Sequence, residues 1–488
     1  MSAPAAIGRA LGGSCGLLLG GRVVTMALAL AATVVLTRGR GAEGFGLYRT
    51  VVAYLGFVSI VASLGLNLLV VREISRAGAD QGRILGHASG LRLVSGLAVI
   101  ALAVAVGWLL PFEPPVRAGI ALGAAGSLAF ICYQLLVGLF QQRLRQLGTV
   151  AAEVAGAAVL LVGAAALAAT GADLLAFVAV TALSQLCTLA VGWWFAQRLQ
   201  RFRPLFDRAE WARLLRASIP IGAMTMLSIT YVRADTLLLA MLAVPEQVGL
   251  YGLASRLLDT VTGVTLMLTG LVAPLVTRHA RHDPAAFREF LGLGLTAAMV
   301  WTMGVAALVG AHAGDIAALI GGASFAGAGP PLALLTLVAP IAATSVLFRD
   351  AAIALDRQRA LLKGYVAAVV VAGAAYLLLI PRLDAVGAAL GLMLGEASVA
   401  VSAFLVVHRA TGIVPPLTAP LCTIASGIAA AAACWGMRQL GLPWPVSMVI
   451  GGTLYGGLLL ATRVVAPATL WQYLGRKPGP ATAGGNGA

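Results

Sequence analysis

Long apolar runs fill most of this chain and constrain its fold more than any other feature. Of its 488 residues, 60% are hydrophobic and only 10% are charged, whereas a soluble domain carries about a quarter charged residues. A helix needs about 20 apolar residues to cross a bilayer, and successive windows predict about fourteen such spans. The longest polar interval, 197–216, is too short to bury a core of its own. The chain is therefore predicted to be an all-α polytopic membrane protein.

The predicted spans leave only short loops between them, except for the interval 311–330, which fits neither a span nor a short loop. The first apolar run continues to residue 36, which favours an uncleaved membrane helix over a signal peptide. The spans cover residues 13–36, 47–71, 86–110, 118–140, 149–169, 174–195, 217–243, 250–276, 290–310, 331–348, 361–380, 385–407, 417–437 and 442–462.

Basic residues are distributed unequally between alternate loops, which predicts the orientation in the membrane. One set of loops carries most of the arginines and lysines, including the clusters in 72–83, 198–216 and 349–363. The other set carries only Arg38, Arg40, Arg117, Arg382 and Arg438. Because loops rich in lysine and arginine stay in the cytoplasm, both termini are expected there. This bias also accounts for the net charge of +15, and no nucleic-acid partner is expected.

A short sequence element occurs twice, six predicted spans apart. Glu43 precedes Gly46-Leu47-Tyr48, and Glu246 precedes Gly249-Leu250-Tyr251, each at the outer start of a span. Internal repeats are typical of transporters built from two related halves. The prediction is an N-lobe at 1–204, a C-lobe at 205–410, two further spans in 411–475 and a disordered tail at 476–488. The alternative is that Gly-Leu-Tyr is merely a common interfacial tripeptide.

Several segments resemble one family of membrane proteins, over roughly residues 10–410. Residues 36–48 (LTRGRGAEGFGLY) and 63–67 (SLGLN) are similar to the first two helices of bacterial polysaccharide transporters. Residues 233–239 (RADTLLL) and 248–257 (VGLYGLASRL) resemble that family's seventh and eighth helices, and 381–396 resembles the link between its eleventh and twelfth. The family includes the O-antigen flippases of the multidrug/oligosaccharidyl-lipid/polysaccharide (MOP) exporter superfamily.

This resemblance implies a V-shaped pair of six-helix lobes in the bacterial inner membrane. Such proteins carry undecaprenyl-diphosphate-linked oligosaccharide from the cytoplasmic to the periplasmic leaflet, for O-antigen, capsule or exopolysaccharide assembly. The implied partners are the polyprenyl-diphosphate-linked oligosaccharide, membrane lipids, and a polysaccharide polymerase or chain-length machinery. Related lipid II flippases line their cavity with arginines on the first, second and eighth helices, where this chain has Arg22, Arg49 and Arg256.

Five arginines lie inside the predicted spans: Arg22, Arg49, Arg92, Arg233 and Arg256. Each costs about 2.5–3.5 kcal/mol near the centre of a membrane helix unless it faces a wet cavity, pairs with an acid or reaches the interface. The guanidinium group binds phosphate oxygens well. All but Arg92, which lies close to a cytoplasmic end, are predicted to be cavity ligands for an anion. Arg49 could instead reach outward from its position near a span end.

The intramembrane acids Glu153, Asp235, Asp259 and Glu396 are candidate ion-coupling residues. Two purely structural interpretations remain open. Arg256 and Asp259 are three residues apart on one helix and could pair with each other. The isolated Glu153 and Glu396 could simply form hydrogen bonds between helices.

Five tyrosines are better placed than the tryptophans to meet a sugar: Tyr48, Tyr54, Tyr133, Tyr231 and Tyr251.

The sequence contains no phosphate-binding glycine loop, metal-ligand cluster or catalytic triad pattern, so neither an enzyme nor a cofactor is predicted. Transport would then run on an ion gradient, the membrane potential or the substrate gradient. Two alternatives to a flippase stay open: an ion-coupled drug or metabolite antiporter of the same superfamily, and a membrane-embedded polysaccharide polymerase or ligase. The second usually has a large outer loop, and the predicted outer loops are short.

Overall fold

The computed structural model describes residues 3–63, 65–76, 80–143, 145–280 and 282–464, and within these ranges the chain is helical with short connections. The helices are α1 (Ala3–Ser63), α2 (Leu66–Ile74), α3 (Gln81–Leu109), α4 (Pro114–Gln142), α5 (Leu147–Thr170), α6 (Leu174–Leu199), α7 (Arg208–Leu242), α8 (Pro245–His279), α9 (Pro284–Ala311), α10 (Ala313–Gly321), the 3-10 helix η1 (Ala323–Ala328), α11 (Gly329–Ala354), α12 (Gln358–Thr411), α13 (Thr418–Gln439) and α14 (Trp444–Ala461).

Polar residues before the apolar runs fix where several helices begin. The carboxylates of Asp80, Asp173, Asp207 and Asp283 each accept a hydrogen bond from a backbone N–H in the first turn of α3, α6, α7 and α9. Aspartate is a preferred residue at this position because it satisfies amides that have no partner within the helix. The short loops therefore both end one apolar run and start the next.

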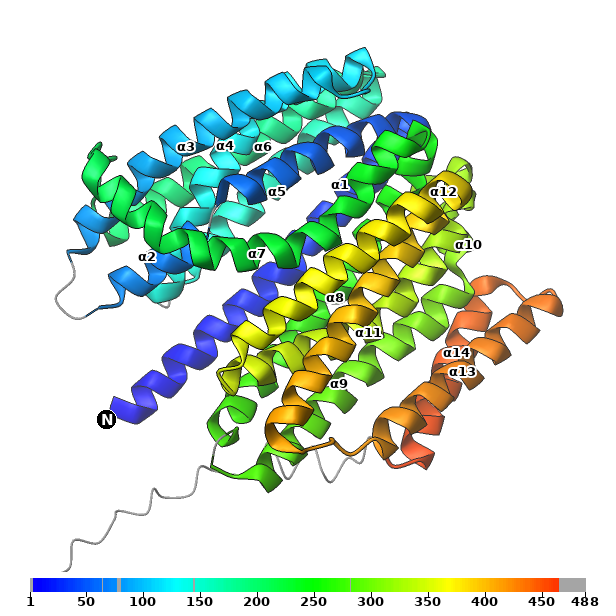
Figure 1. The fold of residues 1–488 in the computed structure, drawn as a ribbon. Helices are drawn as coiled ribbons and strands as arrows, with labels where there is room; N and C mark the ends of the chain where they lie inside the picture. The colour runs from blue at the N-terminus through cyan, green and yellow to red at the C-terminus, as the bar shows by residue number, and fades with distance from the viewer. Residues whose placement is uncertain (1–2, 64, 77–79, 144, 281, 465–488) are drawn as a thin grey trace, which may run out of the picture.

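Eleven of the described helices are long and apolar enough to cross a membrane, which confirms the polytopic all-α fold. Two of them, α1 and α12, turn back on themselves at a residue with non-helical backbone angles: Gly41 (φ 65°) and Asp384 (φ 48°). Figure 1 shows both reversals. Glycine adopts a positive φ without a steric penalty. The predicted number of fourteen spans stays a prediction.

The structure differs from the predicted boundaries in two places. The second predicted span, 47–71, ends at Ser63, and Gly65, with a φ of 69°, separates it from the short helix α2. The unassigned interval 311–330 forms α10 and η1. The tail predicted at 476–488 lies outside the described residues.

The helices pack into two groups that α1 joins. Among the described helices, α4 packs with α3 and α6, while α11 packs with α8, α9 and α12; α1 contacts α4 and α5 as well as α8. The helices α13 and α14 pack on α9, at one edge of the molecule (Figure 1). The lobe boundaries at 204 and 410 stay predictions.

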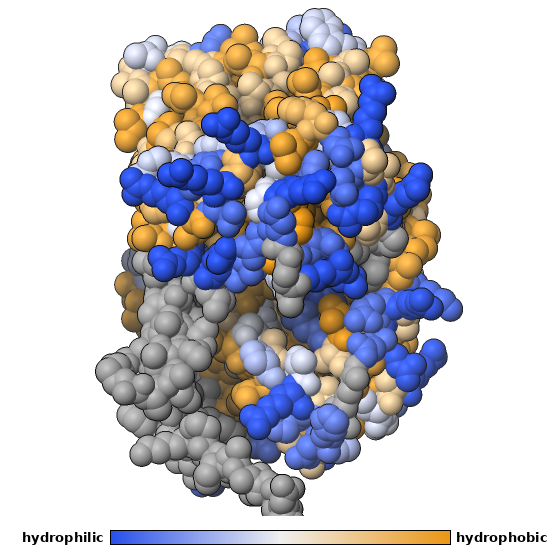
Figure 2. All heavy atoms as spheres, turned by 90° about the vertical axis from the view of Figure 1, so that its left-hand side faces the viewer, coloured by the Kyte–Doolittle hydropathy of each residue, from blue (hydrophilic) through white to orange (hydrophobic). Residues whose placement is uncertain are grey.

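Hydrophilic side chains gather on one face of the molecule. Figure 2 shows them across the middle and at the lower right of the face on which α2 lies in Figure 1, below an upper part that is mostly hydrophobic. Such a face is expected where helix ends and basic loops meet water.

Candidate functional site: an arginine-lined cavity between the helix groups

A cavity of about 450 Å³ lies between α1, α4, α6, α7 and α8, where the two helix groups meet. Its charged lining residues are Arg49, Arg233, Arg256 and Asp259. The remaining polar lining comes from hydroxyl and amide side chains: Ser59, Ser127, Gln134, Thr181, Gln185 and Thr236. Three of the four predicted anion ligands are therefore brought together from three different helices.

Arg233 of α7 pairs with Asp259 of α8 through two N–O contacts of 3.5 Å each. Their side chains are 47% and 38% exposed, respectively. The sequence offered Arg256, three residues away on the same helix, as the partner of Asp259, and that interpretation is wrong. A carboxylate that sits between two helices can be reached by an arginine from either one, and only the packing of α7 on α8 decides which.

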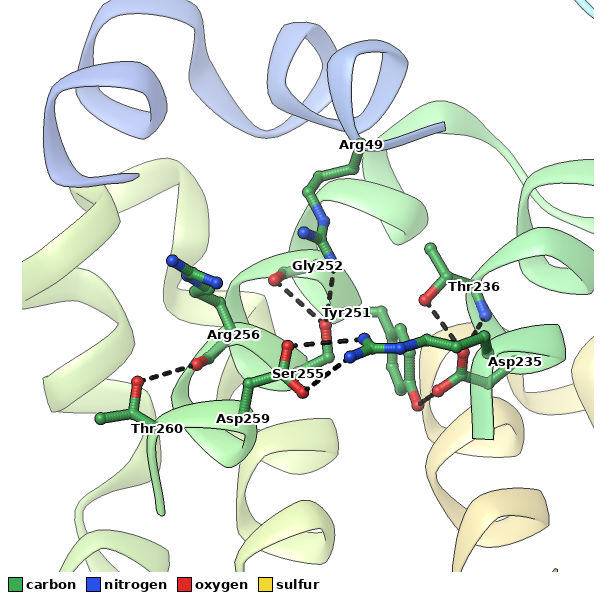
Figure 3. Close-up of polar contacts among 10 residues, drawn as sticks. Arg49, Asp235, Thr236, Tyr251, Gly252, Ser255, Arg256, Asp259 and Thr260 are labelled. Atoms are coloured by element: carbon green, nitrogen blue, oxygen red, sulfur yellow. Dashed lines mark hydrogen bonds and ion pairs between the residues drawn. The ribbon is translucent and has the colours of Figure 1, made fainter. Parts of the chain in front are cut away.

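Arg49 points into the cavity, toward α8 (Figure 3). Its Nη2 donates a hydrogen bond of 3.2 Å to Ser255 Oγ. Gly252 makes room for this side chain, because a Cβ atom there would lie 2.8 Å from Arg49 Cγ and 2.9 Å from Nε. The alternative that Arg49 reaches outward to the interface is therefore wrong.

The guanidinium of Arg256 has no hydrogen bond or ion pair with another described residue; only its backbone carbonyl does, accepting from Thr260 Oγ1. Three guanidinium groups against the one carboxylate of Asp259 leave a surplus of two positive charges in the cavity. An anion that enters would meet one guanidinium that is free and one, Arg49, that has donors to spare. The cavity is suited to an anionic group.

Two of the five intramembrane arginines lie elsewhere. Arg22 is not among the cavity residues: it is 56% exposed and lies 3.7 Å from Glu153. Glu153 is thus paired, where the sequence suggested an isolated acid. Arg92 is 1% exposed and donates to the carbonyls of Ala62, Ser63 and Ile131 and to Asn67 Oδ1.

The buried acids Asp235 and Glu396 are held by hydroxyl groups, of which all but Thr236 come from neighbouring helices. Asp235 accepts from Tyr251 Oη at 2.5 Å and from Thr236 Oγ1 at 3.0 Å. Figure 3 shows this cluster beside the cavity.

Glu396 accepts from Tyr231 Oη at 3.1 Å and from Ser345 Oγ at 2.8 Å. The expected hydrogen bonding of Glu396 between helices is confirmed.

The five tyrosines that the sequence offered as sugar contacts are buried and do not line this cavity; contact of any of them with a sugar stays a prediction. The aromatic lining residues are Phe57 and Phe130. A signal for Phe57 was present in the sequence, since Arg49, Ala53, Phe57 and Ile60 recur at the spacing of one helix face. This spacing assigns Phe57 to the cavity only if Arg49 is already known to face the cavity.

The two copies of the Gly-Leu-Tyr element contact each other. A Cβ atom on Gly46 would lie 1.7 Å from the carbonyl oxygen of Pro245, and one on Gly249 would lie 1.9 Å from that of Ala42. The contact is reciprocal: each glycine meets the residue four positions before the other. Three residues further on, Arg49 of one copy lies against Gly252 of the other, so the repeat itself positions a cavity arginine.

Further contacts join the helix groups near the Gly46–Gly249 contact. The Nη2 and Nε atoms of Arg38 donate to the carbonyls of Leu319 (2.6 Å) and Ile320 (3.3 Å) at the end of α10. Phe45 and Phe325 form an edge-to-face pair at 5.9 Å. These contacts lie at the end of α1 that the sequence predicts to be outer.

The fold is that of MOP transporters. The structure is similar to the lipid II flippase MurJ in an inward closed conformation, with a TM-score of 0.76 and 10% identity, covering 93% of this chain and 99% of that one. It is also similar to a multidrug resistance MATE family transporter of the MOP superfamily in an inward-facing conformation (TM-score 0.64, 14% identity, 80% and 94% covered). A MOP superfamily transporter from Pyrococcus furiosus matches with a TM-score of 0.56 and 13% identity, covering 83% and 95%.

Fold and hydropathy together define the class of this protein as a multi-pass membrane protein with the fold of the MOP superfamily transporters. Residues 12–279 match the family model described as polysaccharide biosynthesis protein. Since the match covers more than half of the chain, the chain belongs to that family. No curated protein sequence matches it.

Proposed function

We propose that this protein is a flippase that moves a polyprenyl-diphosphate-linked oligosaccharide from the cytoplasmic to the outer leaflet of the inner membrane, for O-antigen, capsule or exopolysaccharide assembly. The observation that carries the proposal is the surplus of positive charge in the cavity, from Arg49, Arg233 and Arg256 against Asp259. A diphosphate supplies the negative charge and the oxygen acceptors that these groups lack. A cationic drug would meet repulsion instead.

Alternating access is the mechanism that this cavity supports. The glycine contact between Gly46 and Gly249 closes the outer end, so that the headgroup enters from the cytoplasmic side while the lipid tail stays in the bilayer. Separation of α1 from α8 at this contact would open the cavity outward. Both termini then lie in the cytoplasm, as the charge distribution predicts. The lipid-linked product reaches the outer leaflet, where a polymerase or chain-length machinery would use it. This mechanism requires no catalytic step and no cofactor.

The membrane potential is a sufficient drive for such a substrate. Moving one negative charge to a positive outer side is favoured by about 2.3 kcal/mol per 100 mV. Among the four candidate ion-coupling acids, Glu153 and Asp259 are each paired with an arginine. Asp235 accepts a hydrogen bond from the backbone N–H of Thr236 besides two hydroxyl groups. Glu396 is buried and, among the described residues, is held by hydroxyl donors alone, so we place any proton coupling there. The variant Glu396→Gln should leave potential-driven transport intact and remove its dependence on a pH gradient.

The proposal is tested by translocation in proteoliposomes. The full-length protein should move a fluorescent undecaprenyl-diphosphate-linked saccharide across the bilayer, measured by quenching from one side, and faster when the receiving side is positive. A neutral lipid-linked saccharide should not be moved. Transport of small organic cations without transport of the diphosphate lipid would replace the flippase with an antiporter of the same superfamily.

A further inference from the structure

A second, smaller cavity lies between the two ends of α12, far along the helix from its reversal at Asp384. It has a volume of about 430 Å³. One wall is the start of the helix, with Arg357 and Lys363, and the other is its last turns, with Ser402 and Arg409. The reversal at Asp384 brings the two arms of α12 side by side (Figure 1).

The two arms of α12 pack closely against each other at the base of the cavity. A Cβ atom on Gly364 would lie 2.6 Å from Ser402 Cβ, so glycine is needed there for the close approach. The base of the cavity is therefore built by the packing of α12 on itself.

The charge in this cavity has one sign. Arg357, Lys363 and Arg409 are all exposed, and their side chains make no hydrogen bond or ion pair with other described residues. None of the described residues that line the cavity is acidic. Three cations that line one cavity with no acidic residue in its described lining form a site for an anion such as a phosphate group.

An apolar surface continues from the cavity along both arms. Val366 and Val370 of the first arm are 48% and 64% exposed, and Val401 and Leu405 of the second are 58% and 39% exposed. Each pair is four residues apart and so lies on one side of its helix. Leu405 also lines the cavity itself. A ligand that fits both parts has an anionic head and an apolar tail.

We infer that this cavity binds the headgroup of an anionic glycerophospholipid, with an acyl chain lying along the exposed apolar side chains of α12. The site lies outside the central cavity, and the inference does not depend on what the central cavity transports. Basic pockets between membrane helices at the interface are known to recognise anionic headgroups. The site gives the C-terminal helix group a fixed contact with the lipid around it.

Photocrosslinking tests the inference on the full-length protein in detergent. A photoactivatable phosphatidylglycerol should label peptides from the two ends of α12. Unlabelled phosphatidylglycerol should compete, whereas phosphatidylcholine and inorganic phosphate at the same concentration should not. Equal competition by phosphatidylcholine would overturn the role of charge, and equal competition by phosphate would make this a free-anion site.

The matched variants compare charges inside and outside the cavity. Lys363→Gln with Arg409→Gln should reduce labelling of the α12 peptides by about fivefold or more for each charge removed. The control, Arg278→Gln with Arg359→Gln, removes two exposed cations that do not line the cavity and should leave labelling unchanged. Equal loss in both would overturn the inference. Because the competition experiment uses the wild-type protein, the inference stays testable if a variant misfolds.

Discussion

At the scale of single residues, Gly252 is a test of how Arg49 is positioned. A methyl group there would overlap Arg49 Cγ and Nε, and the side chain would have to leave Ser255. We expect Gly252→Ala to slow lipid translocation about tenfold while the protein inserts normally, because about 1–2 kcal/mol of charged hydrogen bonding to the headgroup would be lost. Gly270→Ala on the same helix is the control, since a Cβ there meets nothing within 4 Å. An unchanged rate in Gly252→Ala would contradict the placement of Arg49.

Arg92 is predicted to act on stability rather than transport. Its side chain is buried and donates hydrogen bonds to the last two carbonyls of α1 and to Asn67 Oδ1. Arg92→Met would leave these acceptors without donors, at about 2–4 kcal/mol in total. Thermal unfolding in detergent should show a clearly lower Tm, with Arg83→Met on the exposed start of α3 as control. A Tm equal to the control would contradict the structural role.

At the scale of elements, the crossing of α1 and α8 depends on two glycines. Gly46→Ala places a methyl group within 1.7 Å of the carbonyl oxygen of Pro245, so the two backbones must separate. We expect a shift toward a state that is open at the outer end. In a cysteine-free background, Ser59→Cys in the cavity should react faster with an impermeant thiol reagent added outside.

Gly20→Ala on the same helix is the control for this experiment, because a Cβ there meets nothing within 4 Å and the residue does not line the cavity. Equal reactivity in the two variants would show that the glycine contact does not close the outer end.

Some features of the helices could be predicted from the sequence, and others could not. The span pattern, the reversal of direction near residue 41 and the importance of the Gly-Leu-Tyr repeat follow from local apolar runs and from self-similarity. The pairing of Asp259 with Arg233 and the direction of Arg49 do not, because they depend on which helix faces which. Arg22 was assigned to the cavity from its place inside a predicted span and from the resemblance, and neither gives the direction in which it points from the first helix.

At the scale of the whole molecule, the central claim is that a positively charged cavity between two related helix groups carries the diphosphate headgroup. Helices from both groups supply it: Arg49 comes from α1, while Arg233 and Arg256 come from α7 and α8. A rigid movement of one group against the other would therefore expose the same arginines to each side in turn.

The most direct test of this claim compares two arginine variants in proteoliposomes loaded with the fluorescent undecaprenyl-diphosphate-linked saccharide. Arg256 lines the cavity, and its guanidinium has no partner among the described residues, whereas Arg22 lies outside the cavity beside Glu153. We predict that Arg256→Gln slows translocation by about tenfold or more and that Arg22→Gln retains nearly the wild-type rate. Wild-type translocation by Arg256→Gln, or an equal loss in both variants, would contradict the account.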